Sequence, residues 1–147
     1  MKVIYLIRDP RAVMNSRYIN WWCQNSSHCI EPEKLCKFDL DDFNAAKEYS
    51  IKYPNDFKFI KYEDLLLDWK SEVTKLYQFV MGEQKPSKDF MKKMEDIFVK
   101  HKKIDGNKST ADTNFTMKWK YSLKPEQLKK IQDNCETIIK TLGYELV

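Results

Sequence analysis

A chain of 147 residues that is 42% hydrophobic and 14% aromatic has the composition of one globular domain, which excludes an intrinsically disordered polypeptide. Its net charge of +4, from 26 basic and 22 acidic residues, suits a polyanionic ligand such as a nucleotide or an acidic glycan. No apolar run is long enough to cross a bilayer, and the first residues do not form a signal-peptide pattern.

The chain begins with a predicted strand and helix joined by a very short turn. Residues 2–7 are dense in β-branched and apolar side chains, which predicts a buried strand. Asp9 is a good N-cap and Pro10 is favoured at the first helical position, so we expect a helix over residues 10–22. Such a strand–turn–helix unit is a building block of α/β proteins.

The remaining sequence predicts more helices and one more strand. Residues 23–36 are polar and rich in turn formers, which indicates a loop stapled by cysteines. Apolar spacing predicts a helix over 39–53, and FKFIKY predicts a strand over 57–62. Further helices are expected over residues 68–80, 88–100 and 124–142, with a polar loop over residues 101–116.

Two glycines mark expected helix ends. Gly82 is expected to stop the helix over 68–80, and Gly143 occupies the C′ position of the last helix.

The sequence predicts only two strands. Two strands cannot make a stable sheet alone, so we expect further strands from upstream of Met1.

The segment with the clearest chemistry is RDPRAVMNSR, residues 8–17, directly after the first strand. Arg8 lies at the carboxyl end of that strand, where open α/β sheets bind ligands. A guanidinium suits phosphate oxygens, Ser16 adds a hydroxyl donor two turns into the helix, and the first helical turn adds a favourable dipole end. These features predict an anion site; the alternative is that Arg8 and Arg11 are surface arginines and Ser16 is incidental.

This segment resembles the 3′-phosphate-binding segment of the sulfotransferases that use the sulfate donor PAPS (3′-phosphoadenylyl sulfate). It is most similar to the Golgi carbohydrate sulfotransferases that act on galactose and N-acetylglucosamine. In that family an arginine at the strand end and a serine eight residues later grip the 3′-phosphate, and Arg8 and Ser16 have this spacing.

Three further segments resemble the family in the same order, so the resemblance covers essentially the whole chain. KYEDL at 61–65 resembles the family's RYEDL turn; Tyr62 and Asp64 in it are interpreted as structural. Residues 108–110 with Trp119 and Lys120 resemble a late "ST…WR" loop that closes over the donor, and Trp119 is interpreted as a core anchor. Cys135 with residues 142–144 resembles the terminal helix and its GY ending.

The resemblance implies a fold and a set of donor-contacting residues. The fold is α/β: the C-terminal part of a P-loop-like parallel sheet flanked by helices, mostly helical in this chain. Arg11 and Arg17 would add positive potential, residues 108–110 would cover the nucleotide, and no metal is implied. The full set of implied donor contacts is Arg8, Ser16, Arg11, Arg17, Lys108, Ser109 and Thr110.

The cysteines and glycosylation sequons favour a secretory compartment over reduced cysteines and unused sequons. The cysteines are Cys23, Cys29, Cys36 and Cys135, and the sequons are at Asn25, Asn107 and Asn114. Four cysteines allow three connectivities. The resemblance implies that Cys36 pairs with Cys135, and Cys23 would then pair with Cys29. A glycan on Asn107 would lie beside the nucleotide, which argues against use of that sequon.

Several family features are expected upstream of Met1. The family holds the 5′-phosphosulfate with a serine- and glycine-rich loop, whereas this chain has only three glycines, none in a strand–loop–helix cradle. The general base and the membrane anchor of a type II Golgi protein are also expected upstream. Residues 1–147 are therefore interpreted as the C-terminal portion of a single sulfotransferase domain, incomplete and inactive by itself.

The predicted reaction of the complete protein is sulfuryl transfer from PAPS to a carbohydrate hydroxyl. Two alternatives remain: a sulfotransferase with a non-glycan acceptor, and a non-catalytic module or pseudoenzyme that binds a nucleotide such as PAP, the desulfated donor. Nucleic-acid binding is disfavoured, because basic and acidic residues are interleaved and no recognition motif is present.

Overall fold

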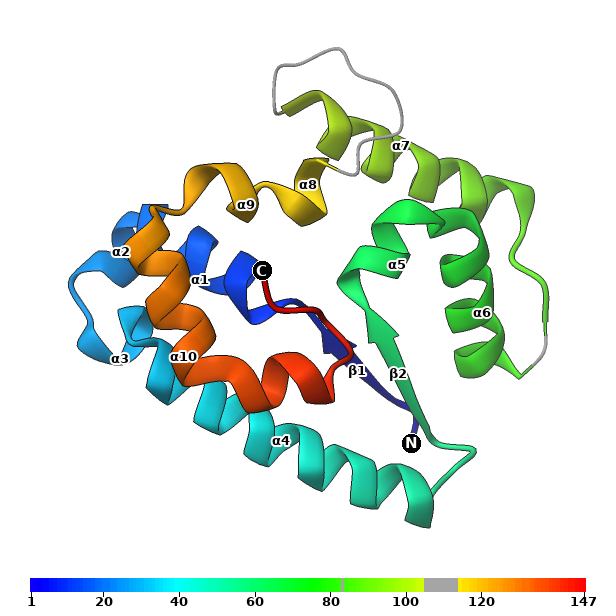
Figure 1. Cartoon of the computed structure of the whole chain (residues 1–147). Helices are drawn as coiled ribbons and strands as arrows, with labels where there is room; N and C mark the ends of the chain where they lie inside the picture. Colours follow the sequence, from blue (N-terminus) through cyan, green and yellow to red (C-terminus); the bar gives the residue numbers. More distant parts are fainter. Residues whose placement is uncertain (83, 105–113) are drawn as a thin grey trace.

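The computed structural model describes residues 1–82, 84–104 and 114–147 (Figure 1). The elements in chain order are β1 (Val3–Ile7), α1 (Pro10–Ile19), α2 (Trp21–Gln24), α3 (Ser27–Ile30), α4 (Pro32–Lys52), β2 (Phe57–Lys61), α5 (Tyr62–Leu67), α6 (Trp69–Met81), α7 (Lys88–Ile104), α8 (Asn114–Met117), α9 (Trp119–Ser122) and α10 (Pro125–Thr141). None of these helices combines the length and hydrophobicity that crossing a bilayer requires.

The two strands pair in parallel, and α1 to α4 form the connection between them. The register runs from Val3 opposite Phe57 to Ile7 opposite Lys61. Side chains alternate along a strand, so Tyr5 and Ile7 face the core while Ile4 and Leu6 lie on the other face, 43% and 55% exposed. The mostly helical α/β architecture predicted from the sequence is confirmed.

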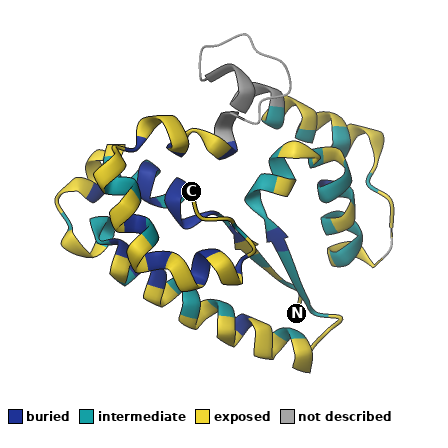
Figure 2. Ribbon diagram, viewed as in Figure 1, coloured by how far each residue is buried: buried dark blue, intermediate teal, exposed yellow. Residues whose placement is uncertain are grey.

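The core lies where α1, α4 and α10 meet on one face of the sheet. Figure 2 shows buried residues concentrated in α1 and α10, whereas α6 and the described part of α7 are mainly exposed or half-buried. The disulfide between Cys36 and Cys135 joins α4 to α10 across this core, with a Cα–Cα distance of 5.2 Å. The fully buried side chains around it include Met14, Ile131, Ile138 and Ile139.

The end of α10 is set by the glycine that the sequence places there. Gly143 has φ of 75°, the left-handed conformation that glycine adopts without strain. Its N–H donates to the carbonyl of Lys140, and the N–H of Tyr144 donates to the carbonyl of Ile139. This is the Schellman arrangement, and it turns the last residues back towards α1 (Figure 1).

The predicted loop over residues 23–36 is wrong for most of its length. It contains α2 and α3, and α4 begins at Pro32 in place of residue 39. Proline suits the first position of a helix, and the buried Leu35 and Cys36 continue the helical apolar spacing towards the N-terminus. The local polar composition hid this periodicity.

Smaller differences occur at other boundaries. Helix α1 ends at Ile19 in place of residue 22, and KYEDL contains the start of a helix, α5, in place of a turn. The predicted loop over 101–116 is helical at both ends, because α7 continues to Ile104 and α8 begins at Asn114. The remainder of that loop lies outside the described residues.

Candidate functional site

The junction of β1 and α1 is fixed by an internal N-cap. The Asp9 carboxylate accepts a hydrogen bond from the backbone N–H of Arg11 at 2.9 Å, and Pro10 occupies the first helical position, as predicted. This acidic cap uses the positive dipole end of α1. The contribution of that dipole to the binding of an external anion stays a prediction.

Arg8 differs from Arg11 and Arg17 because no hydrogen-bond acceptor among the described residues meets its guanidinium. It lies directly after β1, and its Nε is buried without a hydrogen-bond partner. Within the described residues it forms no ion pair; its one charge-related contact is with the ring of Tyr62, 4.5 Å from the guanidinium carbon to the ring centroid. A buried donor without an acceptor is costly, so an anion at this position would be stabilised.

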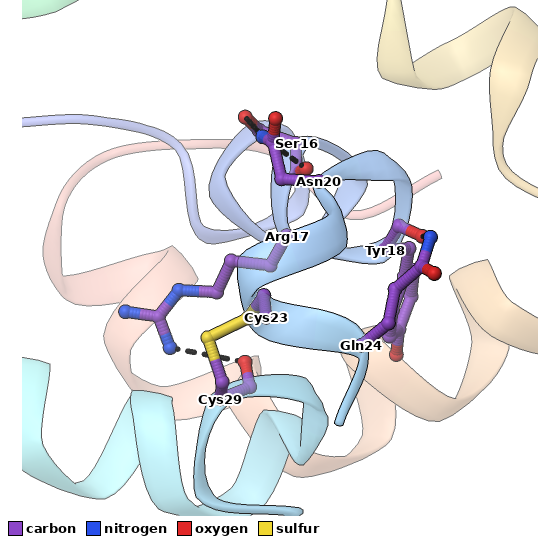
Figure 3. Close-up of a disulfide and its surroundings, with 7 residues drawn as sticks. All are labelled: Ser16, Arg17, Tyr18, Asn20, Cys23, Gln24 and Cys29. Atoms are coloured by element: carbon purple, nitrogen blue, oxygen red, sulfur yellow. Dashed lines mark hydrogen bonds between the residues drawn. A yellow bond between two sulfur atoms is a disulfide. The ribbon is translucent and has the colours of Figure 1, made fainter. Parts of the chain in front are cut away.

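Ser16 lies on α1 with its hydroxyl positioned by Asn20 one turn later. The Asn20 amide donates to the backbone carbonyl of Ser16 at 2.7 Å and to its hydroxyl oxygen at 3.1 Å (Figure 3). No described residue accepts a hydrogen bond from the Ser16 hydroxyl. The hydroxyl proton is therefore available to a ligand oxygen.

Arg17 points away from Ser16. In Figure 3 its side chain reaches towards the Cys23–Cys29 disulfide, where a terminal nitrogen donates to the carbonyl of Cys29 at 3.2 Å. It also lines a cavity of about 170 Å³ beside β1, together with Asp39. Burial raises the pKa of Asp39, and the positive charge of Arg17 partly opposes this rise. The structure thus does not bring the side chains of Arg17 and Ser16 together.

Arg11 is buried and its donors are occupied. Its side chain is 3% exposed and forms an ion pair with Asp9 at 2.8 Å. Another nitrogen donates to the backbone carbonyl of Glu145 at 2.7 Å and to the side chain of Gln132 at 3.2 Å. The guanidinium also stacks on Trp119 at 4.1 Å. These contacts join α1 to the C-terminal residues, and the donor-binding role predicted for Arg11 stays a prediction.

Two residues without a sequence-predicted role form a hydrogen-bonded chain that ends at the backbone next to Arg8. Glu63, in the first turn of α5, accepts a hydrogen bond from the backbone N–H of Asp9 at 3.2 Å. Its other carboxylate oxygen accepts one from the hydroxyl of Tyr144 at 2.7 Å. Burial, followed by the hydrogen bond to Glu63, raises the pKa of Tyr144, so this hydroxyl keeps its proton at neutral pH. The sequence did offer a signal for both, because Glu63 lies in the KYEDL segment and Tyr144 in the GY ending.

Of the other predicted positions, some lie in the described part of the structure and some lie outside it. Trp119 is 1% exposed, which confirms it as a core anchor, and Tyr62 contacts Arg8. The predicted donor-covering residues, Lys108, Ser109 and Thr110, and the sequon at Asn107 lie outside the described residues.

Both predicted disulfides and the Asn25 sequon lie within the described residues. The pairs are Cys23 with Cys29 and Cys36 with Cys135, as the resemblance implies. Asn25 is exposed between the cysteines of the first pair. Across residues 1–82, 84–104 and 114–147, no group of three histidine, cysteine or carboxylate side chains could hold a metal ion.

Comparison with known proteins identifies the family of the chain. The family model described as "Sulfotransferase domain" matches residues 1–143. Carbohydrate sulfotransferase 4 of Mus musculus is 25% identical over 98% of this chain and 42% of its own length. Carbohydrate sulfotransferase 3 of Tetronarce californica is 25% identical over 100% of this chain and 36% of its own length, and the Mus musculus protein of that name is 21% identical. No solved structure gives a significant match.

The three relatives match nearly the whole of this chain but less than half of their own length. They cover 98% to 100% of this chain, while the chain spans 34% to 42% of the length of these curated relatives. The family model reaches from the first residue to Gly143, the residue that ends α10, and so includes both strands and the Arg8–Ser16 segment. The chain therefore belongs to the sulfotransferase domain family.

Proposed function

We propose that this chain binds the 3′-phosphate of PAPS and serves sulfuryl transfer from PAPS to a hydroxyl group of a carbohydrate. The observation that carries the proposal is the Arg8 guanidinium, which lies at the carboxyl end of β1 with a buried, unpartnered Nε. The same chain has an available hydroxyl on Ser16, eight residues later, at the spacing typical of the family.

The chemistry of these residues fits a phosphate monoester. Arg8 offers a planar set of donors that forms no ion pair among the described residues, and the Tyr62 ring supports one face of it. Ser16 offers one more donor whose oxygen is already held by Asn20. Charge-assisted hydrogen bonds of this kind are roughly twice as strong as neutral ones.

In the reaction these residues would bind and orient; the donor, when bound, supplies the sulfuryl group. Catalysis of such a transfer depends mainly on placing the donor in line with the acceptor oxygen and on stabilising charge. Arg8 and Ser16 would fix the nucleotide end, and the predicted role of residues 108–110 would be to cover it. The acceptor-activating base and the contacts to the phosphosulfate are not assigned to residues of this chain.

Two observations support the proposed substrate class and compartment. The matched relatives are named carbohydrate sulfotransferases, which supports a glycan acceptor. The two disulfides support an oxidising compartment, and together with the exposed sequon at Asn25 they support a secretory-pathway location such as the Golgi lumen. We also propose that residues 1–147 are the C-terminal portion of one sulfotransferase domain.

A second candidate function is nucleotide binding without catalysis. The glycines among the described residues favour it, because Gly82 and Gly143 end helices and neither follows a strand to cradle a phosphosulfate. An assay of sulfuryl transfer from PAPS to a panel of glycans separates the two. We expect donor binding without turnover from these 147 residues alone.

The proposal is tested by calorimetric titration of PAP into the chain and into an Arg8→Ala variant. Losing charge-assisted hydrogen bonds to a phosphate should weaken binding by roughly tenfold to hundredfold. Lys129→Ala is the matched control, because Lys129 is an exposed cation paired with Asp133 on α10. Equal affinity of the wild type and Arg8→Ala would contradict the assignment of the phosphate to Arg8.

A further inference from the structure

We infer that Glu63 and Tyr144 are positioning residues that hold Arg8 in the orientation required by the donor 3′-phosphate. This inference rests on the proposed function, because it assumes that Arg8 contacts the phosphate. Glu63 comes from the first turn of α5 and Tyr144 from the segment after α10, 81 residues apart. Neither residue is expected to touch the donor; both act through Arg8.

The dipeptide Tyr62–Glu63 holds Arg8 at two points. The backbone N–H of Asp9 belongs to the peptide bond that follows Arg8, and it donates to Oε1 of Glu63 at 3.2 Å. This bond restrains the plane of that peptide and so the direction in which the Arg8 side chain leaves the backbone. At the far end of the side chain, the Tyr62 ring lies 4.5 Å from the guanidinium carbon.

Tyr144 sets the orientation of Glu63. Its hydroxyl donates to Oε2 at 2.7 Å, which leaves Oε1 directed at the Asp9 N–H. Lys61 lies over the Tyr144 ring, with its Nζ 4.8 Å from the ring centroid. A glutamate held by one oxygen only would rotate about its terminal torsion, which is broad in the absence of a second contact.

The C-terminal segment stays anchored without the Tyr144 hydroxyl. Arg11 donates to the backbone carbonyl of Glu145 at 2.7 Å. Gln132 donates to the carbonyl of Val147 at 2.7 Å and accepts from its N–H at 2.9 Å. Removing the hydroxyl alone should therefore release Glu63 while the rest of the segment keeps its place, so Tyr144→Phe separates positioning from folding.

The experiment compares two nucleotides on four proteins. PAP and adenosine 5′-phosphate, which lacks the 3′-phosphate, are titrated into the wild type, Tyr144→Phe, Glu63→Gln and the control Tyr49→Phe. Tyr49 is 58% exposed on α4 and has no contact with Arg8. We expect PAP affinity to fall about fivefold to tenfold in Tyr144→Phe and Glu63→Gln, as for loss of one ordinary hydrogen bond, with adenosine 5′-phosphate affinity unchanged.

Each outcome supports or overturns the inference. A parallel loss for both nucleotides, or PAP binding by Tyr144→Phe equal to that of the wild type, would overturn it. In an Arg8→Ala background, which has no cation to orient, the hydroxyl should no longer matter, so an undiminished effect of Tyr144→Phe there would also overturn the inference. If the wild type itself binds no PAP, the proposed function fails and the inference fails with it, which is a separate and recognisable result.

Discussion

At the residue scale, the three arginines of the RDPRAVMNSR segment have three different environments. Arg8 has an aromatic ring but no anion among the described residues, Arg11 is buried against Asp9, and Arg17 donates to a backbone carbonyl. The residue type is the same in each case, so the neighbours alone decide which guanidinium remains available to a ligand. Because of this contrast, measurements of stability should distinguish an arginine that binds a ligand from one that holds the fold together.

Replacing Arg11 by alanine should destabilise the fold, whereas replacing Arg8 should not. Asp9 is 4% exposed, and loss of Arg11 would leave its carboxylate buried without its ion-pair partner. Breaking a buried pair in this way typically costs about 3–5 kcal/mol. Urea unfolding followed by circular dichroism measures the difference.

The Arg8→Ala variant is the matched control for that measurement. Its guanidinium makes no ion pair within the described residues and its buried Nε has no hydrogen-bond partner, so the substitution should not lower the free energy of unfolding by more than about 0.5 kcal/mol. An equal loss of stability in the two variants would contradict the expectation that Arg11 stabilises the fold and Arg8 does not.

At the element scale, the boundaries of α1 and α10 are set by local sequence. Asp9 and Pro10 begin α1, and Gly143 ends α10 with its Schellman hydrogen bonds. These ends matter for the site, because one places Arg8 and the other turns Tyr144 towards Glu63. Helix boundaries and site geometry are thus coupled through two short sequence signals.

Gly143→Ala should lower the free energy of unfolding by about 1–2 kcal/mol, because an L-residue at φ of 75° is strained. An added Cβ would meet only the Nζ of Lys61 at 3.5 Å, an ordinary contact, so the cost is conformational. Gly82→Ala is the matched comparison, at φ of 72° with no atom within 4 Å. Thermal melts of both variants should agree; a much larger loss for Gly143→Ala would indicate steric overlap instead.

At the scale of the whole molecule, the two disulfides constrain very different lengths of chain. Cys36 and Cys135 are 99 residues apart and connect α4 with α10, whereas Cys23 and Cys29 are six residues apart. Only the first bridge ties the β1–α4 half of the chain to its C-terminal helix. Stability of the fold, and with it the C-terminal contacts near Arg8, should therefore depend mainly on that bridge.

Replacing both cysteines of the Cys36–Cys135 pair by alanine should cost about 4.7 kcal/mol by loop-closure entropy, against roughly 2 kcal/mol for the Cys23–Cys29 pair. Denaturant titrations of the two double variants provide the comparison. A larger loss for the short-range pair would show that local packing around α2 and α3 outweighs chain entropy.

The sequence by itself determined the local features of this protein. The strands, most helices, the Asp9–Pro10 helix start and the Gly143 helix end depend on residues close together in the chain, so pattern and propensity predict them. The sulfotransferase resemblance also rests on short motifs, and the family comparison agrees with it. The segment 23–36 is the largest exception, because its polar composition conceals the helical spacing.

Only the tertiary structure decided which side chains meet. Glu63 contacts Asp9 across 54 residues, Tyr144 contacts Glu63 across 81, and Arg11 contacts Glu145 across 134. Helical and strand periodicities carry no information about such pairs, because each partner satisfies its local pattern without the other. The structure shows that Arg11 is buried and links α1 to the C-terminal residues, and that Arg8 has no ion-pair partner among the described residues. It also shows that Glu63 bonds both to the backbone next to Arg8 and to Tyr144.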